Sequence, residues 1–414
     1  MRLAQQLNFL SLTLLTALAW SNRTFAADSQ ACEAKNYSDL VSCADKKSSG
    51  IAISLQQLKT SESFVGVAEQ MLNPELEADS VYKGSDRSET NATLLFPIRL
   101  GGKRNALIGE AKSEAERGRA VAEMEIQQSR LGVMLALHRL AHLKRELSLA
   151  AESVETYSKI VSQFQKRPAL SPEQDVSLSV FRIASADYQL RLTNLKSDEE
   201  ALYQSLMALT GITRDQLARN LPSPKNDWPA VEASIEKDAS PQLRVAMADL
   251  QLARSRKDRA ESEAWPDLRI GPSIKAVKEN GESNTYVGFG LSIPLPVFSR
   301  NAAGQVYSAH RVAEAEMGLE QAKRKGSATR AELANRYKQT VESLKNSLSL
   351  DILSGKHERL ERQFFKGLVP SALVIEAHRQ LFDLEQRRNA SELEALDALG
   401  RILILDNKFN EVIL

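Results

Sequence analysis

Apolar residues in three segments of this chain recur every three or four positions, the pattern of a helix that buries one narrow stripe. The segments are 131–147, 178–190 and 393–403, and their surroundings are rich in Ala, Glu, Lys, Arg and Gln, which are good helix formers. Narrow apolar stripes on long charged helices are typical of coiled-coil packing. An ordinary helical bundle is the alternative that the same spacing permits.

Proline placement marks the same helices independently. The thirteen prolines leave four long segments without any proline, namely 98–167, 173–221, 297–369 and 371–414. Because proline inside a helix costs about 3 kcal/mol, each of these segments is predicted to be helical. A helix over 105–165 would be about 90 Å long at about 1.5 Å per residue, which exceeds the diameter of a compact domain of this size.

A strict alternation of apolar with small or polar residues over 286–295 predicts a β-strand, and 267–278 shows the same alternation. About ten residues is the length with which a tilted strand crosses a bilayer. One face of this strand is therefore expected to lie against lipid. Its apolar residues are Val287, Phe289, Leu291 and Ile293.

A matching strand pair is predicted at about 75–100, with Ala92, Leu94 and Phe96 on the apolar face. The second pair is predicted at about 267–298. Four strands are too few to close a barrel alone, and open strand edges in lipid would leave backbone groups unpaired. Several copies of the chain are therefore expected to combine their strands.

Landmarks of the first half return in order in the second half, which indicates an internal duplication. Asn-Pro-Glu-Leu at 73–76 corresponds to Trp-Pro-Asp-Leu at 265–268, and Pro168 corresponds to Pro370. Each half is predicted to contain a helix, a strand pair and a long helical hairpin. The predicted divisions are a first repeat over 27–220, a linker over 221–233 and a second repeat over 234–414.

The first 26 residues have the pattern of a secretory signal peptide, with a basic start, an apolar run and a small-x-small end at 24–26. Cys32 and Cys43, the only two cysteines, follow it in an exported and oxidising setting, so a disulfide between them is predicted. A lipid-anchored Cys32 is the weaker alternative, because the residue three positions before it is not apolar.

Charge and residue inventory exclude several functions. Lys plus Arg number 54 against 53 Asp plus Glu, a balance that argues against nucleic-acid binding. No nucleophile and base constellation is visible, so neither an enzyme nor a cofactor is predicted. His138 and His142 have the i, i+4 spacing of a metal-binding pair. No cysteine or acid near them completes a ligand set, so they are interpreted as a packed or solvated pair, and no metal is expected.

Motifs spread over essentially the whole predicted mature chain carry a family resemblance. They lie at 73–76, 100–104, 291–301 and 367–368. Together they resemble the TolC family of outer-membrane efflux proteins. The Pro-Leu-Pro-x-Phe-x-Arg-Asn pattern at 294–301 resembles the CzcC-like branch, which serves heavy-metal cation efflux.

The resemblance implies a mainly α fold with a small β part. It also implies a homotrimer whose twelve strands form one outer-membrane β-barrel, continued by an α-helical barrel in the periplasm. Such a duct conducts passively, and its implied partners are outer-membrane lipid, a periplasmic adaptor and an inner-membrane pump of the resistance-nodulation-division type.

The resemblance also assigns roles to the two helical tips. Pro168, Gly367, Leu368 and Pro370 are expected to contact the adaptor. In the family, two acids after the second tip line the closed periplasmic entrance.

The two corresponding positions here hold Leu373 and Glu376, so only one acid is kept. Glu376 is predicted to line the entrance, with Asp175 after the first tip as a supplement. The alternative for Glu376 is a solvated acid on a helix surface.

Two other functions stay open at this point. One is a multidrug or type I secretion duct of the same fold. The other is a periplasmic adaptor built on helical hairpins, which the paired strand motifs and the two hairpins disfavour.

Overall fold

The computed structural model describes residues 34–83, 87–231, 240–347, 355, 359–364 and 366–409. The predicted signal peptide, Cys32 and part of the predicted linker lie outside the described residues. Cys43 is buried on the first described helix and takes part in a disulfide. Because Cys32 is not described, its predicted pairing with Cys43 stays a prediction.

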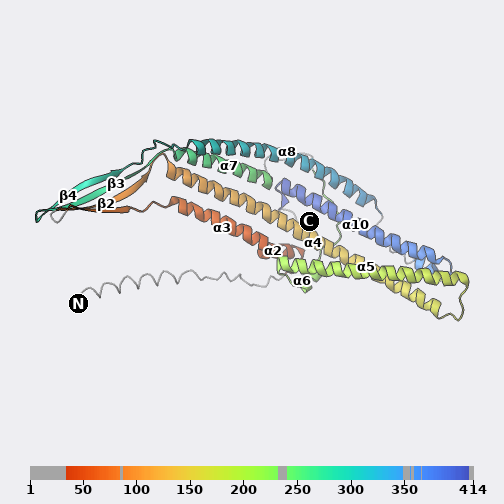
Figure 1. Ribbon diagram of the computed structural model, residues 1–414. Coiled ribbons are helices and arrows are strands. Elements are labelled where there is room, and N and C mark those ends of the chain that lie inside the picture. Colours follow the sequence, from red (N-terminus) through yellow and green to blue (C-terminus); the bar gives the residue numbers. More distant parts are fainter. Residues whose placement is uncertain are drawn as a thin grey trace, which may run out of the picture. The chain divides into compact units, whose positions relative to one another are not determined.

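Two successive sets of elements follow the same order of helix, strand pair and long helices (Figure 1). The predicted mainly α fold with a small β part is confirmed. The first set is α2 (Tyr37–Lys47), α3 (Ser49–Glu69), β1 (Glu75–Lys83), β2 (Arg87–Arg99), α4 (Lys103–Gln165), α5 (Pro172–Thr210) and α6 (Arg214–Arg219). The second set is α7 (Pro241–Ser262), β3 (Asp267–Glu279), β4 (Glu282–Ser292), α8 (Ala302–Asn346) and α10 (Ser371–Leu405).

The long helices begin where the sequence offers a cap or a suitable backbone angle. Gly102 caps α4 with φ 74°, and Asn301 caps α8 with φ 54°, so both strand-to-helix junctions use the left-handed region. Glycine and asparagine enter that region more readily than other residues. A capping box between Ser171 and Gln174 starts α5.

Helix α4 has 63 residues, about 95 Å at about 1.5 Å per residue. It packs against α3, α5, α7 and α10 and so contacts helices of both halves. Within the described part of the chain, no helix combines the length and the apolar character needed to cross a membrane.

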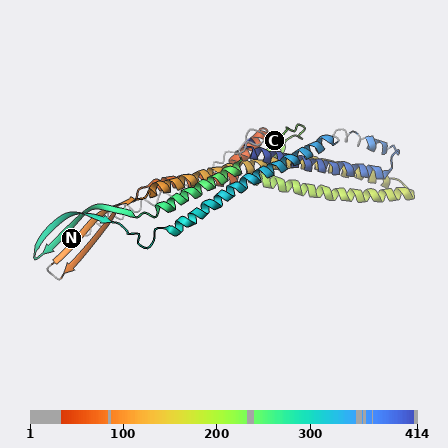
Figure 2. The same cartoon turned by 90° about the horizontal axis from the view of Figure 1, so that it is seen from above.

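The two predicted strand pairs form one antiparallel sheet of order β1-β2-β3-β4 (Figures 1 and 2). The sheet joins the two halves through the pairing of β2 with β3. Asn280 and Gly281 connect β3 to β4 with φ values of 50° and 90°. Positive φ at both central residues is typical of the tight hairpin turns that asparagine and glycine favour.

The register of the sheet places the predicted apolar residues in rows on one face. Directly opposite residues of neighbouring strands share a face, and such rows cross three strands. The opposite face carries polar and charged residues, including an ion pair of 2.6 Å between Glu89 and Lys275. The apolar rows are Ala92–Ile274–Val287 and Phe96–Ile270–Leu291.

An aromatic cluster fills the core between α4, α5 and α10. Tyr157, Phe181, Tyr188 and Phe382 are each 0–2% exposed, and their rings meet mainly edge to face or tilted. Such ring pairs add about 0.5–1.5 kcal/mol each beyond the burial of their area. The cluster therefore holds the last helix of the second half against the hairpin of the first half.

Candidate functional site

The two predicted tips lie side by side. The first tip is the exposed turn between α4 and α5 that contains Pro168, and the second precedes α10. A hydrogen bond of 3.1 Å from Ser371 Oγ to Ser177 Oγ joins the first turn of α10 to the second turn of α5. The two tips of one chain therefore lie next to each other.

Local geometry explains why the second tip protrudes. Gly367 turns the backbone with φ 74°, and Pro370 caps α10 in an extended conformation. Leu368 between them is 71% exposed and thus has its side chain largely in solvent. Contact of these residues with an adaptor stays a prediction.

Glu376 lies in the second turn of α10 with its carboxylate already engaged. Arg379 Nε donates to Glu376 Oε2 at 2.9 Å, Arg379 Nη2 donates to Oε1 at 2.6 Å, and Gln380 Nε2 donates to Oε1 at 2.6 Å. Hydrogen bonds from Arg379 and then Gln380 hold the pKa of Glu376 below its usual value. The carboxylate is ionised at neutral pH, but an arginine of the same chain compensates its charge.

Asp175 and Leu373 are the other two positions considered for the entrance, and only Asp175 carries a charge. Asp175 is exposed in the first turn of α5, on the helix that Ser177 ties to α10. Leu373, where the resemblance leads one to expect a second acid, is 51% exposed. The adjacent helices thus carry two candidate entrance acids near their N-termini, Asp175 in the first turn of α5 and Glu376 in the second turn of α10.

Sequence reasoning missed the charges that surround Glu376. Arg379 also contacts Asp383 at 3.3 Å, and Arg191 on α5 contacts Asp383 at 3.5 Å. The spacing of Glu376 and Arg379, i and i+3 on a helix, was the signal that could have found the first pair. The link across to Arg191 depends on tertiary packing and has no signal in the sequence.

The four residues predicted to face lipid are exposed in the single chain. Val287 is 81% exposed, Phe289 70%, Leu291 64% and Ile293 43%. Large apolar side chains exposed in a continuous set mark a surface that is covered by something else. Their contact with lipid stays a prediction.

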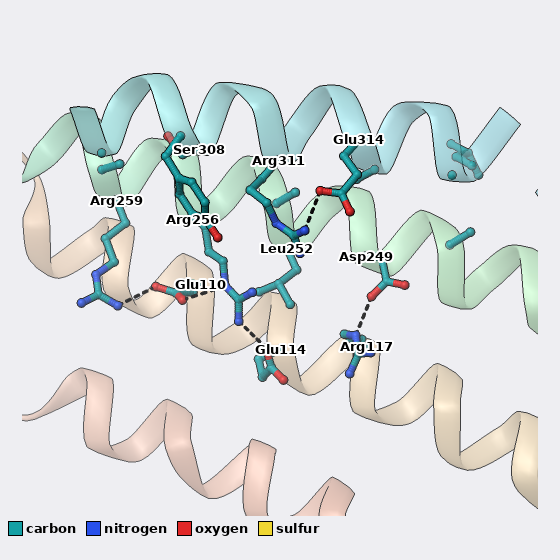
Figure 3. A pocket seen from close by; sticks show the side chains of 18 of the residues that line it. Glu110, Glu114, Arg117, Asp249, Leu252, Arg256, Arg259, Ser308, Arg311 and Glu314 are labelled. Carbon is teal, nitrogen blue, oxygen red and sulfur yellow. Dashed lines mark hydrogen bonds and ion pairs between the residues drawn. The ribbon is translucent and has the colours of Figure 1, made fainter. Parts of the chain in front are cut away.

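A groove of about 870 Å³ lies between α4, α7 and α8 (Figure 3). Its charged side chains are largely joined to each other in ion pairs, so the wall presents little uncompensated charge of either sign. The pairs include Glu110 with Arg256 and Arg259, Glu114 with Arg256, Arg117 with Asp249, and Arg311 with Glu314.

The interpretation of His138 and His142 needs a correction. Both rings are buried, and a third potential ligand, Glu392, lies beside them. The expectation that no acid completes the pair is wrong because Glu392 comes from α10, far along the sequence. Only the packing of α10 against α4 brings the three residues together.

The chain is similar in sequence to known proteins, although no family model matches it. Cobalt-zinc-cadmium resistance protein CzcC of Cupriavidus metallidurans is 25% identical over 268 residues, 64% of this chain. The match spans 63% of the length of CzcC, just under two thirds. Nickel-cobalt-cadmium resistance protein NccC of Alcaligenes xylosoxydans xylosoxydans is 24% identical over 318 residues, 73% of this chain and 70% of NccC.

Among solved structures, the CmeC outer membrane channel of Campylobacter jejuni matches with a TM-score of 0.71 at 12% identity. The match covers 91% of this chain and 86% of CmeC. The chain has the TolC-like fold. The resemblance to TolC-like outer-membrane efflux proteins is thereby confirmed, and CzcC and NccC support its CzcC-like part.

Proposed function

We propose that this chain is the outer-membrane exit channel of a tripartite efflux system, and that it passively conducts heavy-metal cations. The observation that carries the proposal is the sheet, which has one exposed apolar face and one charged face. A wall that separates lipid from an aqueous lumen needs these two faces. The curated relatives are resistance proteins and CmeC is a channel, which supports the prediction that this chain is not an enzyme.

Closure of the channel requires more than one copy. Within the described strands, β1 pairs only with β2 and β4 pairs only with β3, so each outer strand has one unpaired edge. An unpaired backbone group in lipid costs several kcal/mol. Three chains with four strands each would close a barrel of twelve strands and remove these edges.

The helices carry a second sign of self-association. Val176, Val180, Ile183 and Leu190 on α5 are 41–70% exposed and follow a heptad spacing, with Asp187 at the intervening position. The spacing over 178–190 had placed Leu190 in the buried stripe, whereas its side chain is 67% exposed. An exposed apolar seam of this kind fits a neighbouring helix of another copy in a coiled-coil arrangement.

Location, cargo and partners follow from the resemblance and the relatives. We place the sheet in the outer membrane and the long helices in the periplasm. The names of CzcC and NccC specify resistance to cobalt, zinc, cadmium and nickel, and these cations are the proposed cargo. The exposed tips would receive a periplasmic adaptor and a pump of the resistance-nodulation-division type.

The experiment combines assembly, conductance and resistance. Purified protein in detergent should be trimeric by light scattering and should form ion-conducting pores in planar bilayers. A strain in which the gene is deleted should become more sensitive to zinc, cobalt, cadmium or nickel. Reintroducing the wild-type gene should restore resistance. Sensitivity to dyes alone would favour a multidrug duct, and a monomer released from membranes by high salt would favour an adaptor.

A further inference from the structure

The pair of histidines on α4 and one acid on α10 form a small cluster away from the tips and the sheet. His138 and His142 lie one helical turn apart and are 3% and 1% exposed, while Glu392 is 8% exposed. Two histidines and a carboxylate are a donor set that binds zinc and similar ions. Buried polar side chains normally have a partner, so the burial of these two rings requires an explanation.

The distances within the cluster match one ion held by three ligands. His142 Nε2 lies 3.4 Å from Glu392 Oε1, and His138 Nδ1 lies 3.9 Å from the same oxygen. One ligand atom from each residue lies within 4.8 Å of the other two. Ligands bound at about 2.1 Å in a tetrahedral site are about 3.4 Å apart, so small side-chain rotations would complete the geometry.

Polar atoms in and beside the cluster lack well-aligned hydrogen bonds. Neither ring nitrogen of His142 makes a well-aligned hydrogen bond among the described residues, although Nε2 lies 3.4 Å from Glu392 Oε1, and the buried hydroxyl of Tyr37 on α2 has no hydrogen-bond partner there. The Tyr37 ring meets the His138 ring edge to face at 5.8 Å between centroids. Buried polar atoms without a well-aligned hydrogen bond are unfavourable, so a ligand that engages His142 Nε2 would stabilise the folded chain.

Glu392 is held in place by groups other than the histidines. The backbone N–H of Lys225, on the segment after α6, donates to Glu392 Oε1 at 3.2 Å. Arg145 Nη2 lies 3.8 Å from the other oxygen, Oε2. Partners that orient a ligating carboxylate in this way raise metal affinity, because less freedom is lost on binding.

The charges around the cluster leave room for a cation. On α4 and α10, the carboxylates of Glu146, Glu385 and Glu392 face the guanidinium groups of Arg139 and Arg145. Glu146 and Glu385 are 0–1% exposed, and each has one carboxylate oxygen without a hydrogen-bond partner among the described residues. On the linker side, the ammonium of Lys225 interacts electrostatically with Asp227 and, less strongly, with Glu392. An ion at the histidines would offset the excess of buried acid.

We propose that His138 Nδ1, His142 Nε2 and Glu392 Oε1 bind one divalent transition-metal ion of the zinc and cobalt type. The ion would be resident rather than cargo, because all three ligands are buried within one chain. It would join α4 of the first half to α10 of the second and thereby stabilise the packing between the two halves. The proposal does not depend on the proposed channel function.

The test uses full-length protein stripped with a chelator and then loaded with Co²⁺ or Zn²⁺. After desalting, wild type should retain about one ion per chain, because buried ligands exchange slowly and bind tightly. The Co²⁺ form should show the visible absorption of a tetrahedral site without a sulfur-to-cobalt charge-transfer band. Zn²⁺ should also raise the unfolding temperature of wild type, because it binds the folded chain.

Matched variants separate this site from other histidines. His142→Gln and Glu392→Gln should lose the bound ion, the Co²⁺ absorption and the shift of the unfolding temperature. His310→Gln on the exposed face of α8 should retain all three. His378→Gln should do so as well, since buried His378 is held by Ser153 and Glu361.

Wild-type protein alone gives a decisive reading if the variants fail to fold. Retention of no ion by folded wild type would overturn the proposal and leave a buried ion pair or an ordered water in its place. Full retention by folded His142→Gln would also overturn it.

Discussion

The guanidinium of Arg379 donates two hydrogen bonds to the carboxylate of Glu376, at 2.9 and 2.6 Å, one turn along the same helix. Glu376 is the single acid kept of the two that the resemblance places at the entrance. Its pairing means that a trimer would present three compensated carboxylates rather than a ring of free negative charge. Selectivity at this entrance should therefore be weaker for cations than the acid alone implies.

Removing the arginine should expose that charge. In Arg379→Gln, we expect the cation-to-anion permeability ratio in planar bilayers to rise about twofold, a modest change because the site is exposed and screened by salt. Glu376→Gln should lower the ratio. Arg401→Gln is the matched control, since Arg401 Nε donates to both carboxylate oxygens of Asp397 farther along α10. Equal ratios in wild type, Arg379→Gln and Glu376→Gln would show that Glu376 does not line the pore.

The same pair sets a pH dependence. Hydrogen bonds from Arg379 and Gln380 lower the pKa of Glu376 in the folded chain. An ordinary glutamate titrates near about 4.3, so Glu376 should keep its charge below that pH and lose it only as pH falls through the lowered value. The pH midpoint of selectivity should therefore move upward in Arg379→Gln. A midpoint that is the same in both proteins would contradict this assignment.

Local patterns predicted the elements well because their causes are local. The absence of proline predicted a helix over 105–165, and α4 spans Lys103–Gln165. Period-two alternation predicted an apolar face through Phe96 and Leu291, and the register places both in one row with Ile270. A one-residue shift would have moved these side chains to the charged face, so the period-two alternation itself specifies the register.

The contacts between the two halves could not be predicted from the sequence. Nothing near Arg87 indicates that β2 pairs with β3 rather than staying a separate hairpin. Nothing near His142 indicates Glu392, because helix packing across the duplication brings them together. Glu376 and Arg379 are the intermediate case, since their spacing was readable but their two-bond geometry was not.

The junction between β2 and α4 gives a stability prediction with an internal control. Gly101 and Gly102 both have positive φ, 66° and 74°, but only a Cβ at Gly101 would meet the Trp265 ring, at 2.4 Å. Each alanine substitution should cost about 1–2 kcal/mol for the left-handed backbone, and Gly101→Ala should cost more because of the ring. Thermal unfolding measures both.

Trp265 itself tests the cause of that difference. Trp265→Ala should reduce the additional cost of Gly101→Ala in the double variant without abolishing it, because Trp265 Cβ, which alanine keeps, would also lie 2.6 Å from the new Cβ. It should leave the effect of Gly102→Ala unchanged. Equal unfolding temperatures for Gly101→Ala and Gly102→Ala with Trp265 present would contradict the role of the ring.

Substitutions at two nearby residues of α5 distinguish effects on folding from effects on assembly. Phe181 is 0% exposed in the aromatic core, whereas Ile183 is 70% exposed on the heptad seam. Phe181→Ala should destabilise the chain itself by about 3–5 kcal/mol. Ile183→Ser should leave the helical circular dichroism intact and shift the trimer toward monomers at low concentration, because it removes apolar area only between copies.

Light scattering in detergent over a dilution series measures the assembly, and thermal unfolding followed by circular dichroism measures the fold. Gln189→Ser is the control, because Gln189 is exposed on α5 but lies off the heptad positions. A trimer of Ile183→Ser that dissociates at the same concentration as wild type and Gln189→Ser would place the subunit interface on another face. The apolar seam of α5 would then need a different partner, since a stripe of four large apolar residues in water is unfavourable for any exported protein.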